Sequence, residues 1–182
     1  LDAIAYIWKT LGTNCIHLTE THLIIQLFRD VLDVVAPHVV VITETNVPHD
    51  ENISYFGDGI HEAQMVYQFT LPPLVLHAFM TGDARKLSEW AGTIAPPSNT
   101  ASYFNFTASH DGVGMRPLEG LWADPADEAD VLAGMVAQTK AHGGAVSTRS
   151  LGDGTEKPYE LNITYFDGLS NPASDEAQQV QV

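Results

Sequence analysis

The sequence has few of the residues on which several classes of protein depend. Cys15 is its single cysteine, which excludes a disulfide framework and a thiolate metal cluster and agrees with a reducing, cytoplasmic location. Lysine and arginine together number 8, against 23 aspartates and glutamates, so the formal net charge is −15. Nucleic acids and anionic membranes attract clustered basic side chains, and neither is therefore an expected partner.

Long hydrophobic runs and cofactor-binding motifs are also missing. No stretch of 18 apolar residues occurs, so the sequence predicts no membrane-spanning helix. No G-x-G-x-x-G or G-x-x-x-x-G-K motif follows an expected strand, which argues against a dinucleotide or P-loop site. The pattern H-E-x-x-H is absent as well. We therefore expect no resident cofactor or metal and a small, neutral, polar substrate.

The most informative stretch that is present runs from Val39 to His49. Four β-branched residues in a row, Val39 to Ile42, lead through Thr43 into a polar cluster that starts at Glu44. This pattern predicts a strand over 39–43 that is buried on both faces and ends at an accessible cleft. The carboxyl ends of parallel strands are where active sites form, so Glu44 is a catalytic candidate. A structural carboxylate that caps a helix or pairs with a lysine is the alternative.

The rest of the chain alternates between strands and helices. The end of a strand is expected at 1–5. A helix is expected over 21–36, with Ile24, Leu27, Phe28, Val31 and Val35 at helical spacing and Pro37 after it. Further helices are expected over 71–80, 83–94 and 125–141, and further strands over 65–69, 102–107 and 159–166, with an irregular segment over 143–153. Such alternation predicts a parallel α/β sheet, for which a β/α barrel is preferred to a doubly wound sheet.

Three carboxylates occupy the same kind of position in this pattern. Asp2, Glu44 and Asp111 each lie at the C-terminal tip of an expected strand, and in a barrel such strand ends share one rim. Two neighbouring carboxylates can divide the work of glycoside chemistry, one as nucleophile and one as proton donor. A metal site formed by these carboxylates with His17, His49 or His110 is the rival interpretation, although no ligand spacing supports it.

The same residues carry a family resemblance. Leu1 to Tyr6, Ile42 to Asn46 and Ala108 to Gly112 resemble motifs at the ends of the fourth, fifth and seventh strands of the alpha-amylase superfamily barrel. The surrounding sequence is similar to the sucrose phosphorylase group. The resemblance implies a partial TIM (β/α)8 barrel, about strands four to seven, with a loop and strand excursion near the C-terminus. It implies one partial catalytic domain over 1–182.

The resemblance also implies roles for individual residues. Asp2 would be the nucleophile, Glu44 the general acid/base and Asp111 the residue that stabilises the transition state, with His110 bonded to the sugar. Tyr6 could line the sugar pocket, and Tyr159 lies in a stretch that resembles the mobile phosphate- and acceptor-binding loop of the group. The reaction implied is glucosyl transfer from an α-glucoside such as sucrose to inorganic phosphate, with retention. Arg116, Arg149 and Lys157 could help to bind phosphate, or could be ordinary surface cations.

Two departures from sucrose phosphorylases concern the acceptor side. Asn46 stands where those enzymes tend to have histidine, and Glu160 where they tend to have glutamine. Glucosylglycerate, glucosylglycerol and sucrose 6'-phosphate are therefore alternative donors. A hydrolase or transglucosylase, and a non-catalytic barrel, are further alternatives. A homodimer is left open as the assembly.

The two ends of the sequence suggest an internal piece of a longer protein. Leu1 starts as if inside a strand, and Gln178 to Val182 resembles the opening of a helix. An incomplete barrel leaves sheet edges and apolar faces uncovered. We therefore expect the 182-residue chain by itself to be inactive.

Overall fold

The computed structural model describes residues 1–175, and the helix start expected at Gln178 lies outside them. The chain divides into two compact units. The first contains Leu1–Gln68 and Ile94–Asn105, and the second contains Phe69–Thr93 and the chain from Phe106 onward.

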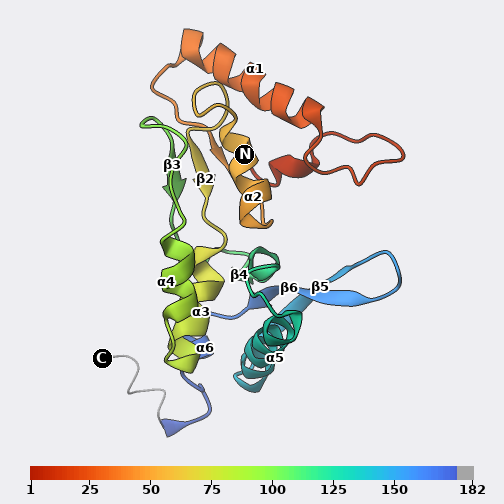
Figure 1. Ribbon diagram of the computed structural model, residues 1–182, viewed down its shortest axis with the longest axis vertical. Helices are drawn as coiled ribbons and strands as arrows, with labels where there is room; N and C mark the ends of the chain where they lie inside the picture. Colours follow the sequence, from red (N-terminus) through yellow and green to blue (C-terminus); the bar gives the residue numbers. More distant parts are fainter. Residues whose placement is uncertain (176–182) are drawn as a thin grey trace. The chain divides into compact units, whose positions relative to one another are not determined.

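The first unit is built on a parallel three-stranded sheet (Figure 1). Its strands stand in the order β1, β2, β3, with bounds Ile42–Thr43, Met65–Tyr67 and Ser102–Phe104. Helix α1 spans Thr19–Val35, helix α2 spans His49–Asn52, and the 3-10 turns η1 and η2 span Ile4–Tyr6 and Ile53–Phe56. Because parallel neighbours need crossover connections, this arrangement confirms the expected α/β class.

One face of this sheet is covered by apolar side chains from the helical segments. Val41 and Val66 pack with Ile25 of α1 and with Tyr55 and Phe56 of η2. All five are less than 6% exposed. Successive strand residues point to opposite faces, so Ile42, Glu44, Met65 and Tyr67 belong to the other face of the sheet.

Helix α1 begins two residues before the expected position and ends at Val35, just ahead of Pro37, as the sequence indicated. The face it buries differs from the expected one. Thr21, Ile25 and Arg29 are its buried residues, because Arg29 is held by hydrogen bonds to Asp33, the Val39 carbonyl and Gln64. The expected apolar residues Leu27, Phe28, Val31 and Val35 are 38–69% exposed.

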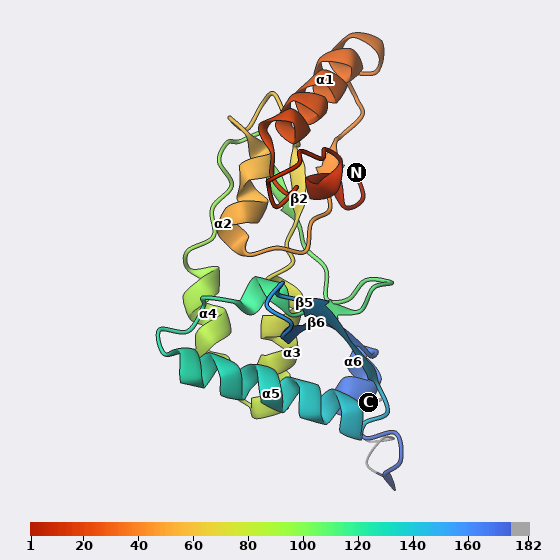
Figure 2. The same ribbon diagram turned by 90° about the vertical axis from the view of Figure 1, so that its right-hand side faces the viewer.

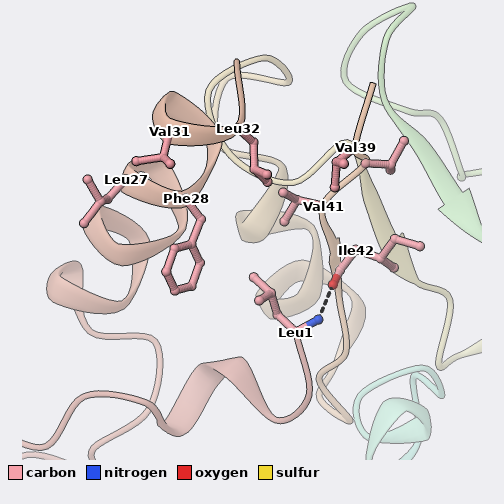
Figure 3. A pocket seen from close by; sticks show the side chains of 9 residues that line it. Leu1, Leu27, Phe28, Val31, Leu32, Val39, Val41 and Ile42 are labelled. Carbon is pink, nitrogen blue, oxygen red and sulfur yellow. Dashed lines mark hydrogen bonds between the residues drawn. The ribbon is translucent and has the colours of Figure 1, made fainter. Parts of the chain in front are cut away.

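Leu27, Phe28 and Val31 form one wall of an apolar pocket of about 620 Å³. Figure 3 shows the side chains of α1 on one side, the segment 39–42 on the other and Leu1 between them. The lining residues are Leu1, Leu27, Phe28, Val31, Leu32 and Val39 to Ile42. This lining lacks charged side chains and is therefore unsuited to a sugar or to phosphate.

Two expectations at this edge are wrong in detail. The strand expected over 39–43 is limited to Ile42–Thr43, and Val39 and Val40 are 38% and 51% exposed rather than buried on both faces. Residues 4–6 form a 3-10 turn instead of the end of a strand. Among residues 1–175, Leu1 alone pairs with β1 on this side, so within this part of the chain no strand lies beside the segment before Ile42 there.

The second unit combines helices with an antiparallel sheet. Its helices are α3 (Leu71–Thr81), α4 (Arg85–Ala91), α5 (Pro125–Ala141) and α6 (Tyr165–Leu169), with the 3-10 turn η3 at Arg116–Leu118. Its strands are β4 (Val113–Gly114), β5 (Ala145–Ser150) and β6 (Glu156–Asn162), in the order β4, β6, β5. Figure 2 shows α5 alongside the β5–β6 hairpin.

Sequence patterns placed α3, α4 and α5 well, including the start of α5 at Pro125, which the Asp124 side chain caps. The hairpin was missed in part. Residues expected to be irregular form β5, and the strand expected over 159–166 starts earlier and gives way to α6. Thr164 accepts a hydrogen bond from the Asp167 amide and so caps α6. No helix among residues 1–175 has the length and apolar character needed to cross a bilayer.

Candidate active site

The first unit brings the expected nucleophile and the expected acid/base onto neighbouring chain segments. The Leu1 amino group donates to the Ile42 carbonyl at 2.7 Å (Figure 3). The Glu44 amide donates to the Leu1 carbonyl at 3.0 Å. This is the bonding pattern of parallel strands in which Leu1 lies beside Thr43. Asp2 and Glu44 therefore follow paired positions at the ends of adjacent segments.

The backbone conformation after Asp2 is fixed by the buried side chains of Ile4 and Ala5. Ala3 has a left-handed φ of 45°, and Ile4 and Ala5 are 3% and 0% exposed. The turn they form leaves Asp2 exposed and Tyr6 39% exposed. The Lys9 ammonium lies 5.4 Å from the centre of the Tyr6 ring. Tyr6 thus presents an accessible aromatic face four residues after Asp2.

Two histidines, His17 in the loop after Tyr6 and His22 in α1, form hydrogen bonds to residues of the segment that follows Glu44. His17 Nδ1 lies 2.7 Å from the Tyr55 hydroxyl and its Nε2 lies 2.9 Å from Glu51 Oε2. The ring of His22 stacks on Tyr55 and its Nδ1 lies 2.8 Å from Glu62 Oε2. The pKa of Tyr55 is raised, chiefly because its phenol is buried. The sequence offered His17 only as a possible metal ligand and gave no role to His22, because partners 34 to 40 positions away leave no local signal.

Asn46 lies between β1 and α2, in the segment that continues from Glu44. Val47 is 1% exposed, and its amide bonds to the Thr45 carbonyl at 3.0 Å. Helix α2 then begins at His49, where burial lowers the pKa of the imidazole. Asn46 is half-buried. Its side chain therefore sits in a segment that buried neighbours hold in place.

An aromatic side chain that the sequence reading did not single out lies in the same row as Glu44. The pairing of Thr43 with Val66 places Glu44 beside Tyr67, and Tyr67 pairs directly with Phe104. The Tyr67 and Phe104 ring centres are 4.8 Å apart. Burial and then the Glu44 charge raise the pKa of Tyr67. The sequence signal that could have identified Tyr67 is its position in the strand expected over 65–69, which ends at the same rim as the strand before Glu44.

The second unit holds the other expected catalytic carboxylate, Asp111, in a short turn. The Asp111 amide bonds to Ser109 Oγ at 3.2 Å, and Asn162 Nδ2 donates to the Asp111 carbonyl at 2.8 Å. His110 Nε2 lies 3.4 Å from Asp111 Oδ1, and both side chains are exposed. Gly112 has a φ of +92°, and a Cβ there would lie 2.3 Å from the Leu161 carbonyl oxygen. Only glycine fits, so this turn fixes where the Asp111 backbone lies.

Strand β6 carries the two expected acceptor-side residues. Glu160 pairs in register with Gly114 and accepts a hydrogen bond from Ser147 Oγ at 3.3 Å. The Tyr159 carbonyl accepts from the Met115 amide at 2.8 Å. Both residues are half-buried and belong to the same unit as Asp111.

Cations near these residues already have carboxylate partners. Arg149 Nη2 lies 2.7 Å from Glu119 Oε1, and Lys157 Nζ lies 3.8 Å from the same atom. Glu119 offsets part of their charge, which weakens the case for either as a phosphate ligand. Among residues 1–175, no group of three histidine, cysteine or acidic side chains is arranged to hold a metal ion.

The fold defined by these elements is part of a β/α barrel. A solved structure, sucrose 6F-phosphate phosphorylase from Thermoanaerobacter thermosaccharolyticum, superposes with a TM-score of 0.73 at 22% identity, covering 97% of this chain and 34% of that chain. The structure therefore confirms the expected partial α/β barrel, which is not closed. A search against models of protein families found no match.

Comparison with curated sequences places the chain more closely. It is 52% identical over 182 residues to glucosylglycerate phosphorylase of Allomeiothermus silvanus, covering 100% of this chain and 32% of that protein. Glucosylglycerate phosphorylase of Escherichia coli is 49% identical over 98% of the chain and 31% of that protein. Sucrose phosphorylase of Bifidobacterium adolescentis is 26% identical over 93% of the chain and 32% of that protein.

The chain is thus similar in sequence to glucosylglycerate phosphorylases and to sucrose phosphorylases, as the motifs indicated. It spans about a third of the length of the curated relatives it matches.

Proposed function

We propose that these 182 residues form part of a longer retaining α-glucoside phosphorylase whose donor is glucosylglycerate. The observation that carries the proposal is the pairing of Leu1 with β1, which sets Asp2 and Glu44 on adjacent segments. Adjacent strands are about 4.8 Å apart, and retaining enzymes hold their two carboxyl groups about 5 Å apart. The spacing of neighbouring strands therefore suits a nucleophile and an acid/base.

In the reaction proposed, the Asp2 carboxylate attacks the anomeric carbon of the donor. The bond from that carbon to the glycerate oxygen breaks, and Glu44 gives its proton to the departing oxygen. A β-glucosyl ester forms on Asp2. An oxygen of inorganic phosphate then attacks the same carbon, the bond to Asp2 breaks, and α-glucose 1-phosphate forms with retention.

The remaining expected residues take supporting roles in this proposal. Asp111 binds sugar hydroxyls and stabilises positive charge in the transition state, with His110 beside it. Tyr6 contributes an aromatic face to the sugar site. Asn46, Tyr159 and Glu160 act on the acceptor side.

The preference for glucosylglycerate over sucrose rests on sequence similarity. Identity is 52% with one glucosylglycerate phosphorylase and 26% with a sucrose phosphorylase over nearly the same length. Glucosylglycerate was one of the alternatives to sucrose, and it becomes the first candidate.

The test is a phosphorolysis screen with the full-length protein. Glucosylglycerate, sucrose, glucosylglycerol and sucrose 6'-phosphate are each supplied with and without phosphate, and α-glucose 1-phosphate is measured. We expect product from glucosylglycerate only when phosphate is present, and loss of at least about a thousandfold in Asp2→Asn and Glu44→Gln. Asp50→Asn, an exposed carboxylate on α2, is the matched control.

Three outcomes of this screen oppose the proposal. Glucose release without phosphate would indicate a hydrolase, and a different preferred donor would reject glucosylglycerate. Full activity in both carboxylate variants would reject the site.

A further inference from the structure

Beyond the three carboxylates, the first unit carries a row of side chains across its sheet. The β1–β2 register ends at the pair Thr43 and Val66, so Glu44, directly after β1, stands beside Tyr67 of β2, and Tyr67 pairs with Phe104 of β3. Residues in register on parallel strands point to the same face. That face is opposite to the one bearing Val66, which is fully buried against η2 and α1. Glu44 therefore has an aromatic neighbour on the side away from Leu1.

The backbone of Tyr67 is held on both sides. Asn52 Nδ2 donates to the Tyr67 carbonyl at 2.7 Å, and Asn52 is 1% exposed. The Gln68 amide donates to the Phe104 carbonyl at 3.0 Å. These bonds join β2 to α2 and to β3, so the Tyr67 ring starts from a fixed backbone.

The ring itself is supported by Phe104. Their centres are 4.8 Å apart with an interplanar angle of 42°, which is within the range of favourable aromatic pairs. Phe104 is 37% exposed. The pKa of the Tyr67 phenol is raised, first by burial and second by the negative charge of Glu44, so the two side chains interact electrostatically.

We propose that Tyr67, supported by Phe104, is a positioning residue that keeps water away from Glu44 and so limits hydrolysis of the glucosyl-enzyme. This inference rests on the proposed function. Water must lose a proton to attack the glucosyl ester, and Glu44 is the base that would take it. Phosphate is already an anion and attacks without that help. A residue that excludes water beside Glu44 therefore slows hydrolysis and leaves phosphorolysis largely unchanged.

The experiment measures both fates of the intermediate in the full-length protein. Glucosylglycerate is supplied with phosphate, and glucose and α-glucose 1-phosphate are quantified together to give a ratio of hydrolysis to phosphorolysis. For Tyr67→Ala we expect this ratio to rise by about tenfold, and for Tyr67→Phe to stay within about twofold, because the ring remains. Phe104→Ala should raise the ratio by a smaller factor.

Controls separate this role from a structural one. Phe79→Ala removes a 69% exposed aromatic ring of α3 outside the row and should leave the ratio unchanged. If Tyr67→Ala does not fold, as judged by its circular dichroism and thermal transition, Tyr67→Leu replaces it. Restoration of the ratio by phenylalanine is a readout that loss of stability alone does not produce.

The outcomes are distinct. A raised ratio in Tyr67→Ala or Tyr67→Leu with a normal ratio in Tyr67→Phe supports the inference. An unchanged ratio in a folded variant without the ring overturns it, and so does an equal rise in Tyr67→Phe, which would assign the effect to the hydroxyl. Absence of α-glucose 1-phosphate from the unmodified protein would instead reject the proposed function itself.

Discussion

The Glu44 amide donates a 3.0 Å hydrogen bond to the carbonyl oxygen of Leu1, the residue directly before Asp2. Leu1 and Glu44, which are 43 positions apart in the sequence, thereby become neighbours through main-chain bonding alone. Main-chain pairing tolerates changes of side chain, and it fixes the register of the two segments. The relation between the two candidate carboxylates therefore depends on the strand ends and not on loops.

The apolar pocket beside α1 leads to a prediction about the isolated 182-residue chain. Exposed Leu27, Phe28 and Val31 should bind a hydrophobic dye such as ANS, and the chain alone should show no turnover. Leu27→Glu should reduce the dye signal in the isolated chain. In the full-length protein it should lower the melting temperature, because we expect this face to be covered there.

Val34→Glu is the matched control for that substitution. Val34 lies on the same helix, is 84% exposed and does not line the pocket. Its substitution should leave the melting temperature of the full-length protein within about 2 °C. Phosphorolysis by the isolated chain, or an unchanged melting temperature for Leu27→Glu, would contradict the prediction.

Replacing Gly112 tests the turn that holds Asp111. Gly112→Ala places a Cβ 2.3 Å from the Leu161 carbonyl oxygen at a φ of +92°. We expect a loss of about 1–3 kcal/mol in the free energy of unfolding and a fall in kcat, since Asp111 would move. Denaturant unfolding and steady-state kinetics measure the two effects.

Gly152→Ala provides the comparison for Gly112. Its φ is +82°, and no atom lies within 4 Å of the added Cβ. The same backbone conformation is thus strained without a steric clash, and the loss should be about 1 kcal/mol with kcat unaffected. Equal effects at both glycines would show that the contact with Leu161 is unimportant.

The buried Tyr55 hydroxyl should contribute measurably to stability. Tyr55→Phe removes the 2.7 Å hydrogen bond to His17 Nδ1 and leaves that nitrogen without this partner. The free energy of unfolding should fall by about 1–2 kcal/mol. Tyr103→Phe, which removes a 3.2 Å bond from an exposed site to the Ala95 carbonyl, should cost less. Urea titration measures the free energy of unfolding of both variants. A larger loss in Tyr103→Phe than in Tyr55→Phe would contradict the stabilising role assigned to the Tyr55 hydroxyl.

Stability should depend on pH through His49. Burial holds the pKa of His49 below its usual value in the folded protein. As the pH falls through about 6.5, the unfolded chain binds a proton that the folded protein does not, so the free energy of unfolding decreases. His49→Gln should flatten the decline between about pH 7.5 and pH 5.5 in urea denaturation. An unchanged slope in His49→Gln would contradict the role of His49.

The sequence by itself determined the kind of fold and the candidate carboxylates. Helical spacing and Pro37 define α1, and Asp124 and Pro125 mark the start of α5, because capping and the backbone limits of proline are local effects. Likewise, the change from β-branched residues to the polar Glu44 marks the end of β1, because this pattern too involves neighbouring residues only. These features depend on residues a few positions apart, so they can be read along the chain.

Tertiary structure alone decided which side chains meet. The burial of Arg29 in place of Leu27, the contact of His17 with Tyr55 and the row of Glu44, Tyr67 and Phe104 all join distant segments. Register between strands sets the last of these, and a shift by one residue would turn every side chain to the other face. Long-range pairing leaves no periodic signal in the sequence, and for that physical reason Tyr67 became a candidate only in the folded chain.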